Sequence, residues 1–310
     1  MVAEVEGRIG MPGALARRSA GRRTQAGRAA LLLAPSLVFL FAFTYWPIGQ
    51  VLVQSLTIET FGSDLVSFGL GNFERLLADA SFGRAVSNNL LYALGTILPS
   101  VAVAMALAVG LQDATRFNAA LRTVVFFPVL LPLVAAAALF LFVFMPGIGL
   151  LDYYLAKLGA GSTNWLGNPD IALWSLVVLT VWKNAGYYML FFLAGLQAIP
   201  LDLYEAARIE GAGAWARFRR ITLPLLGPTL AFVLVIALVN VITQVDHVVV
   251  LTEGGPSDST NLLLFYIYQQ AHENYDYGKA AAATVLSVAG LLALSFLSLR
   301  TLERGIHYEA

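Results

Sequence analysis

The chain of 310 residues has no cysteine, only three histidines, and few charged side chains, which make up 12% of it. Without cysteine there is no disulfide, no thiolate metal ligand and no cysteine nucleophile. The histidines, His247, His272 and His307, stand too far apart to form a metal-binding motif. A soluble globular protein usually has about 25% charged residues. The formal net charge of zero gives no bulk attraction to nucleic acid, so no nucleic-acid partner is expected.

Long apolar runs dominate the sequence instead. Hydrophobic residues make up 58% of it, and the mean hydropathy is +0.74. A soluble core of ordinary shape cannot hide so much apolar surface, and only helices satisfy their own backbone while crossing about 30 Å of hydrocarbon. Pro99, Pro128 and Pro132 are expected to be tolerated as kinks. We predict an all-α integral membrane protein with six transmembrane helices, near residues 29–55, 87–111, 121–145, 171–195, 225–251 and 279–302.

Basic residues are distributed unevenly between the two sides of these spans. Most of the 19 lysines and arginines lie in the N-terminal tail, the second and fourth loops and the C-terminus. Cytoplasmic loops carry an excess of Lys and Arg, so both termini and the fourth loop are expected in the cytoplasm. The polar leader and the long apolar run after it differ from a cleaved signal peptide. We expect a disordered, Arg-rich tail at 1–28, the transmembrane domain at 29–302 and a second cytoplasmic tail at 303–310.

The fourth loop contains EAARIEGAGAWARFRRITLPLLGP, from Glu205 to Pro228, one of the few polar passages in the chain. Asp202 and Glu205 form D-x-x-E, a near relative of the capping box. This pattern predicts a short helix from Leu203 to Glu210. Gly211 and Gly213 suit a left-handed C-terminal cap and a sharp turn. The passage is therefore expected to contain a helix that ends abruptly in the middle of the loop.

A second short helix is expected over residues 214–222, and Pro224 is expected to end it. Ala206, Ala207 and Ala212 remove side-chain bulk, so a partner could approach the backbone closely, as in helix-in-groove docking. The alternative interpretation is an ordinary loop that obeys the positive-inside rule. A DNA-binding helix–turn–helix is disfavoured because the segment is held between two membrane spans.

This passage resembles the EAA loop of permease subunits in binding-protein-dependent ABC importers. The resemblance rests on E-A-A, then an acidic residue with G-A, then I-x-L-P. Glu210 is a mild departure, because many members have Asp there. Other stretches are similar to the larger sugar-type permeases, those of maltose and sn-glycerol-3-phosphate: GLGNFERLL, NWLGNPDIAL, VWKNAGYYMLFFLAGLQAIP and VLTEGGPSDST.

The resemblance implies a type I importer bundle of six membrane helices with a cytoplasmic coupling helix, in a bacterial or archaeal cytoplasmic membrane. It implies that the EAA loop, residues 200–228, sits in a cleft of a cytoplasmic ATPase dimer that binds ATP and Mg. The other implied partners are a second homologous permease, an extracytoplasmic solute-binding protein and membrane lipid. The residues implied to couple to the ATPase are Glu205, Ala206, Ala207, Glu210, Gly211 and Ala212.

No catalytic motif stands out in the sequence. It has no G-x-x-x-x-G-K-[ST] loop, so the chain is not expected to hold ATP as a Walker-type ATPase. It also has no H-E-x-x-H or G-x-S-x-G motif, and no cofactor is expected in this chain. We therefore expect a non-enzymatic conduit for a carbohydrate or a related solute, such as an oligosaccharide or glycerol phosphate, that is powered by another chain.

Polar residues within two spans are the candidate solute path, because such residues are costly in a membrane and usually functional. Steps of three and four place two groups of them on helix faces: Thr180, Lys183, Asn184 and Tyr187 in the fourth span, and Asn240, Thr243, Gln244 and His247 in the fifth. We expect the two faces to meet across the path, with Asp246 as the partner of Lys183; a phosphate is the other candidate. The alternative is hydrogen bonding between helices. The path candidates are Trp182, Lys183, Asn184, Tyr187, Asn240, Thr243, Gln244 and Asp246.

The sequence has two further features on the outward side of the membrane, and two other functions compete with that of an ABC importer permease. A short helix is expected around Leu150–Leu158. The polar patch of His272, Glu273, Asp276 and Tyr277 is either a docking surface for a solute-binding protein or a solvated loop. A secondary transporter would require inverted repeats and a midplane carboxylate, but no repeat is evident. An integral membrane enzyme is disfavoured because paired catalytic groups are lacking.

Overall fold

The computed structural model describes residues 32–59, 66–159 and 161–303. The expected tail at 1–28 and residues 304–310 lie outside this range. The chain divides into two compact units, Met1–Val53 and Gln54–Ala310. The first described element is a continuous helix over Leu32–Leu56, as predicted for the first span. It contains a π-helical stretch, η1 (Phe41–Tyr45), directly before α2 (Trp46–Leu56), where Pro47 cannot donate to the helical ladder.

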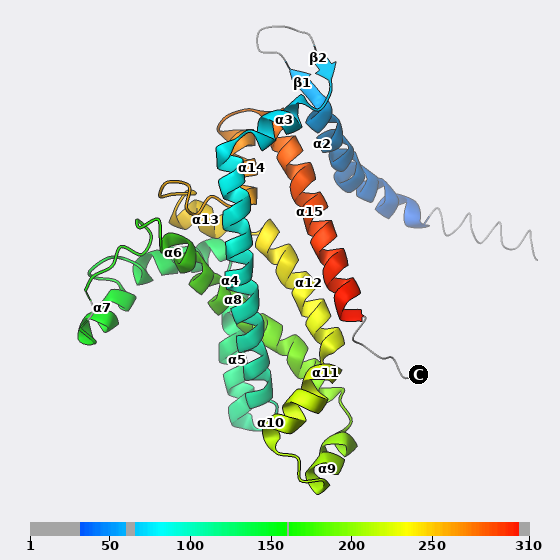
Figure 1. Cartoon of the computed structure of the whole chain (residues 1–310), viewed down its shortest axis with the longest axis vertical. Helices are drawn as coiled ribbons and strands as arrows, with labels where there is room; N and C mark the ends of the chain where they lie inside the picture. The colour runs from blue at the N-terminus through cyan, green and yellow to red at the C-terminus, as the bar shows by residue number, and fades with distance from the viewer. Residues whose placement is uncertain (1–31, 60–65, 160, 304–310) are drawn as a thin grey trace, which may run out of the picture. The chain divides into compact units, whose positions relative to one another are not determined.

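The second unit is a helical bundle with one small hairpin (Figure 1). Strands β1 and β2 pair antiparallel, with Thr57 opposite Phe68. The predicted outward helix around 150–158 is confirmed as α7. In chain order the elements are β1 (Thr57–Glu59), β2 (Val66–Phe68), α3 (Gly71–Leu77), α4 (Ala80–Gly110), α5 (Arg116–Leu130), α6 (Leu133–Val143), α7 (Leu150–Lys157), α8 (Ala172–Gln197), α9 (Leu201–Ile209), α10 (Ala214–Arg217), the π-helical η2 (Phe218–Thr222), α11 (Leu223–Leu225), α12 (Gly227–Thr243), α13 (Asp246–Leu251), α14 (Leu263–His272) and α15 (Tyr277–Glu303).

Four of the described helices are long and apolar enough to cross a membrane by themselves: Leu32–Leu56, α4, α8 and Tyr277–Leu297 of α15. Two bent helix pairs bring the number to six if each pair is one span. The prediction of six apolar spans is thus confirmed, but the predicted span 121–145 is not one helix. It consists of α5 and α6, which meet at an angle of 100°.

The break between α5 and α6 follows from Pro132. A residue before proline is disfavoured in the helical region, and Leu131 accordingly adopts φ −73° and ψ 134°. The sequence prediction treated Pro132 as a tolerated kink, whereas it separates two helices. The predicted span 225–251 is also interrupted, because α12 ends at Thr243 and Gln244 is extended. Before α12 lies a bend of 65° from the helices that precede it.

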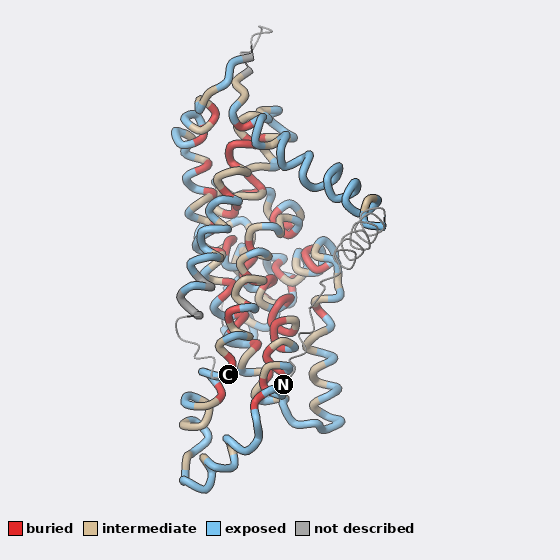
Figure 2. Tube along the Cα trace, turned by 90° about the vertical axis from the view of Figure 1, so that its right-hand side faces the viewer, coloured by how far each residue is buried: buried red, intermediate tan, exposed pale blue. Residues whose placement is uncertain are grey.

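The core of the second unit lies around α8. In an apolar stretch of 18 residues in each helix, 67% of the stretch is buried for α8, against 33% for α4 and 22% for α15. Figure 2 shows the buried residues concentrated inside the bundle. Tyr188, Met189 and Phe192 of α8 pack there with Tyr92 of α4 and Val233 of α12. We call the region of α3, the first turns of α4, the loop before α14, α14 and the start of α15 the α3 end. The opposite region, with α9, α10 and the ends of α4 and α8, is the α9 end (Figure 1).

Candidate functional site

The α9 segment, Leu201–Leu225, is the observed form of the EAA passage. Helix α9 ends in a Schellman motif, in which the Ala212 amide donates to the Ala207 carbonyl at 2.8 Å and the Gly211 amide donates to Arg208 at 3.0 Å. Gly211 has φ +80°, so the predicted left-handed cap is confirmed. Gly213 has φ −67° and stands at the start of α10. Only Gly211 of this pair therefore needs the conformational freedom of glycine.

The two ends of the helix pair differ from the prediction. Helix α9 begins at Leu201 after Pro200, and no side chain caps it. Asp202 lies in its first turn, where a carboxylate favours the helix dipole, so the predicted D-x-x-E cap is wrong. The second helix is α10, which continues through η2 into α11, and Pro224 lies within α11. Pro224 cannot donate to the helical ladder, and the π-helical stretch η2 lies directly before the helix that contains it.

The outer surface of the α9 segment is unusually open for a helical region. No residue of α9 is buried, and Glu205, Ala206 and Glu210 are exposed. Two large apolar side chains beside them also face solvent, because Ile209 is 88% exposed and Trp215 is 72% exposed. Small side chains, acidic groups and exposed apolar groups together form a surface that suits a protein partner.

Lys183, the most unusual polar residue of the fourth span, is buried against the break between α5 and α6. Its ammonium donates to the carbonyl oxygens of Pro128 at 3.2 Å and Val129 at 3.4 Å, and also to that of Leu131. These carbonyls belong to the C-terminal turn of α5, where a cation is favoured. The prediction that Asp246 is its partner is wrong, because the bonds go to backbone groups that have no signature in the sequence.

Gly186, one turn after Lys183, brings α8 and α5 into close contact. A Cβ atom at this position would overlap the carbonyl oxygen of Val125 and approach the Cα atom of Phe126. The short approach and the carbonyl bonds of Lys183 fix α8 against the end of α5. Lys183 and Gly186 of the fourth span therefore stabilise the break between α5 and α6.

A hydrogen bond joins α8 to α12, but its α8 member, Tyr188, was not among the predicted path residues. Asn240 of α12 donates to the Tyr188 hydroxyl of α8 at 3.1 Å, and Tyr187 lies beside Tyr188 with ring centroids 5.7 Å apart. Thr243 bonds its own helix at the Val239 carbonyl. The other candidates diverge: Trp182 packs on Phe140 of α6, Asn184 is buried, Gln244 is half-buried at the end of α12, and Asp246 is exposed at the start of α13.

A buried polar cluster joins α4, α8 and α13 through Tyr92, and of its members only Tyr92 was absent from the predicted polar faces. The Tyr92 hydroxyl lies 2.7 Å from Thr180 Oγ1 and 2.8 Å from His247 Nε2, and all three residues are buried. The signal in the sequence was a polar stripe on α4 at steps of three and four. That stripe consists of Asn89, Tyr92, Thr96 and Ser100, all buried.

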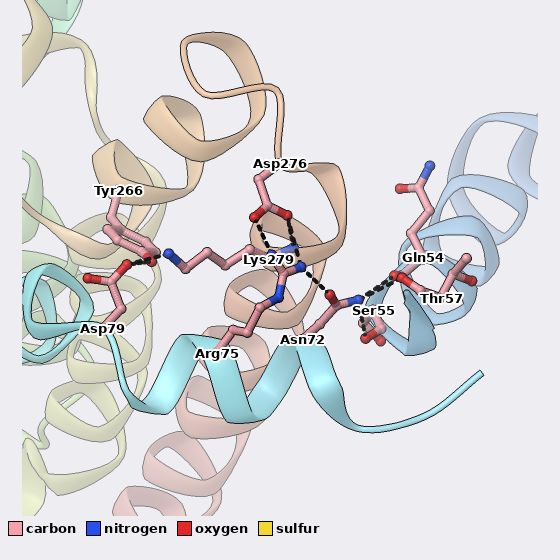
Figure 3. Close-up of polar contacts among 9 residues, drawn as sticks. All are labelled: Gln54, Ser55, Thr57, Asn72, Arg75, Asp79, Tyr266, Asp276 and Lys279. Atoms are coloured by element: carbon pink, nitrogen blue, oxygen red, sulfur yellow. Dashed lines mark hydrogen bonds and ion pairs between the residues drawn. The ribbon is translucent and has the colours of Figure 1, made fainter. Parts of the chain in front are cut away.

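A network of charges and hydrogen bonds holds the α3 end together (Figure 3). Lys279 lies 2.5 Å from Asp79, which also accepts a bond from the Tyr266 hydroxyl. Arg75 pairs with Asp276 at 3.0 Å. Asn72 donates to the carbonyls at the end of α2 and the start of β1. Asp276 of the predicted outward patch is thus used within the chain, and His272 stacks on Tyr268.

Comparison with known proteins identifies the family. Residues 100–308 match the family described as binding-protein-dependent transport system inner membrane component. The sn-glycerol-3-phosphate transport system permease proteins UgpA of Agrobacterium fabrum and Rhizobium meliloti are each 34% identical, over 90% of this chain and 95% of those proteins.

Solved structures agree in fold. A bacterial ABC transporter involved in the import of the acidic polysaccharide alginate has a chain with a TM-score of 0.81 at 24% identity, covering 93% of this chain and 99% of that one. A bacterial alginate ABC transporter in complex with an alginate pentasaccharide-bound periplasmic protein gives 0.76 at 24% identity, covering 89% and 93%. The resemblance drawn from the EAA passage is confirmed: the chain belongs to the inner membrane components of binding-protein-dependent transport systems and is a multi-pass permease subunit of an ABC importer.

Proposed function

We propose that this permease carries a carbohydrate or a glycerol-phosphate type solute into the cell, driven by ATP hydrolysis in a separate ATPase dimer. The observation that carries the proposal is the α9 segment, which exposes a compact helix pair without burying any residue of α9. The solute class rests on the similarity to sn-glycerol-3-phosphate permeases over 90% of the chain. ATP and Mg would be bound by the ATPase.

The exposure of α9 supports the proposed coupling role of its residues. Glu205 and Ala206 are exposed on α9, and Ala207 and Ala212 form the hydrogen-bonded turn around Gly211. With Glu210, they would present one charged, low-bulk edge to the ATPase. Closure of the ATPase dimer would push α9, and the rigid turn would pass that motion through α10 to α12. The chain would thereby switch the side on which its path opens.

The solute path would lie between α8 and α12, at the contact of Asn240 with Tyr188. Tyr187, Asn184 and Trp182 of α8 would contribute, together with Thr243, Gln244 and Asp246 near the end of α12. Amides and hydroxyls suit the hydroxyl groups of a sugar or polyol, and aromatic rings suit its apolar face. Lys183 would act on the path indirectly, because its ammonium is used by the end of α5. We expect Gln244→Leu to raise the solute concentration for half-maximal uptake.

The topology follows from the positive-inside rule. Residues 1–28 and 303–310 would be cytoplasmic tails on a transmembrane domain at 29–302, and the coupling loop at 200–228 would lie on the same side. The α3 end would then face outward, toward a solute-binding protein. A second homologous permease would complete the path. A thermal-shift screen of the cognate binding protein against sugars and glycerol phosphates would identify the solute.

A pair of charge reversals tests the coupling assignment. Glu205→Lys places a cation on the exposed face of α9, while Glu74→Lys makes the same change on exposed α3 at the opposite end. We expect Glu205→Lys to reduce both co-elution with the ATPase and solute-stimulated hydrolysis about tenfold or more, because charges at an interface core are strongly coupled. Glu74→Lys should leave ATPase binding unchanged. Equal ATPase binding by both variants would contradict the proposal.

A further inference from the structure

An open pocket of about 420 Å³ lies between the α9 segment and the ends of α4 and α8. Its walls include Leu201, Tyr204 and Arg208 of α9, which recur at steps of three and four and so share one helix face. Glu205 and Ile209 do not line it. Helix α9 therefore has two different faces: one turned to solvent, where a partner would dock, and one turned to the pocket.

Positive charge in this pocket is not satisfied by the chain. Among the described residues, neither Arg208 nor Arg217 forms an ion pair, although both line the pocket. The Arg217 Nε atom is buried and has no hydrogen-bond partner. A buried donor without an acceptor costs about 1–3 kcal/mol, and more when it is charged. Arg122 at the same end shows the contrast, because the carbonyls of Leu111 and Asp113 accept from its guanidinium.

We propose that this pocket binds a phosphate group between Arg208 and Arg217. Guanidinium groups present planar pairs of donors that match phosphate oxygens, and such bonds are among the strongest in proteins. Gln112 and Gln197 add amide groups to the wall, and Asp113 leaves a net charge of +1 among the lining side chains. The volume lies within the range of about 300–1,000 Å³ for small-molecule sites.

The bound phosphate would add a further link between two helices that the chain connects through the turn at Gly211 and through the hydrogen bond between Tyr204 of α9 and Thr222 of η2 at 2.9 Å. Arg208 belongs to the last turn of α9 and Arg217 to α10. A shared anion would fix the angle between them and reduce their opening. The phosphate could belong to a small phosphorylated solute or to a lipid headgroup, since the pocket lies at the ends of membrane helices α4 and α8. The inference stands independently of the coupling role of Glu205.

Hydrogen exchange of the full chain tests this site. One arm uses the chain in dodecyl maltoside, a detergent without phosphate, titrated with inorganic phosphate, and the other uses nanodiscs that contain phosphatidylglycerol in phosphate-free buffer. We expect slower exchange over residues 207–222 that saturates with phosphate in the first arm, or that is present without it in the second. The arm that shows protection identifies the source of the phosphate group.

Matched arginine pairs make the outcome specific. R208Q/R217Q should lose the protection or weaken phosphate binding about tenfold or more, because two charge-assisted contacts are removed. R219Q/R220Q removes the same charge from two residues of the same segment that do not line the pocket. This variant should retain the protection from exchange. R208K/R217K should bind several-fold more weakly than the natural chain, which keeps the test open if the glutamine pair does not fold. Protection in neither arm, or equal loss in both glutamine pairs, would overturn the proposal.

Discussion

The α3 end and the α9 end of the bundle both carry charge, but among the described residues only the α3 end pairs charged side chains with each other. All three ion pairs among the described residues lie at the α3 end. There, Lys279 and Asp79 lie 2.5 Å apart, with side chains only 18% and 20% exposed. At the α9 end, Glu205 and Glu210 are exposed and form no ion pair among those residues.

We interpret the α3 end as a structural scaffold and the α9 end as the proposed docking surface. An exposed pair is worth about 0–1 kcal/mol, so the α9 end loses little stability by leaving its charges unpaired in water. Once a partner covers them, the same charges need counter-charges, which gives specificity to docking. At the α3 end the chain supplies the partners itself, so that end keeps its geometry without another subunit. The comparison predicts functional defects from changes at the α9 end and stability defects from changes at the α3 end.

The largest effect is expected from Gly211→Ala at the α9 end. A Cβ at Gly211 meets no atom within 4 Å, so the cost comes from φ +80° alone, about 1–2 kcal/mol. That energy corresponds to roughly tenfold in the population of the docked turn. We expect solute-stimulated ATP hydrolysis to fall by about that factor, with little change in thermal unfolding.

Gly213→Ala is the matched control for this change. Gly213 also has open space around its Cβ position, but its φ is −67°, which alanine adopts readily. Gly213→Ala should keep a near-normal rate of solute-stimulated ATP hydrolysis. Equal effects of the two substitutions would show that the turn at Gly211 has no special role in solute-stimulated ATP hydrolysis.

An effect on stability, not on ATP hydrolysis, is expected from Lys279→Met at the α3 end. The substitution leaves the partly buried carboxylate of Asp79 without its cation, which costs about 1.5–3 kcal/mol. Arg84→Met removes a cation from Asp258 in a pair whose side chains are 60% and 37% exposed, so about 0–1 kcal/mol is expected. Thermal unfolding in detergent should separate the two by several degrees. Equal shifts would show that the network of Figure 3 is not a scaffold.

The smallest effect concerns the loop between α6 and α8, where the chain again satisfies its own charge. Bonds from the Gly147 amide, the Ser162 hydroxyl and the Trp165 indole lower the pKa of Asp152 from 3.8 to about 2. A lowered pKa in the folded state means that the stabilisation is complete above pH 3.8 and is lost as the pH falls toward 2.

Asp152→Asn should therefore loosen this loop at neutral pH, measured as faster hydrogen exchange over 147–165. The difference between the variant and the natural chain should stay constant from pH 8 to about 5, shrink as the pH falls below 3.8, and disappear only below about 2. A difference that disappears near neutral pH would contradict the assigned hydrogen bonds. Uptake should change less than for Gly211→Ala, because the loop lies away from the α9 segment.

The sequence predicted the parts of the fold that depend on hydropathy and on local turn chemistry. Apolar runs located six spans, and the glycine pattern predicted the left-handed turn at Gly211. It did not predict the 100° break after Leu131, because a proline in a membrane span is compatible with either a kink or a complete break. Packing of α6 against α13 stabilises the separated helix, and no residue pattern announces that contact.

The same reason explains the error at Lys183. Its acceptors are backbone carbonyls that become available only because α5 ends at Leu130, so a search among side chains could find only Asp246. The buried contact of Tyr92 with His247 was missed for a different reason. The polar stripe on α4 was visible in the sequence, but its relation to α13 depends on tertiary packing across 155 positions.

Single cysteines test directly whether the α9 segment is cytoplasmic and is covered by the ATPase, because the natural chain has no cysteine. Ala206→Cys on α9 and Ala78→Cys at the end of α3 both replace exposed alanines. In inside-out membrane vesicles, we expect a membrane-impermeant maleimide to label Ala206→Cys and not Ala78→Cys. Addition of the ATPase subunits should slow the labelling of Ala206→Cys about tenfold or more, because the thiol would be covered at an interface. Labelling of Ala206→Cys at the same rate with and without the ATPase would contradict the account.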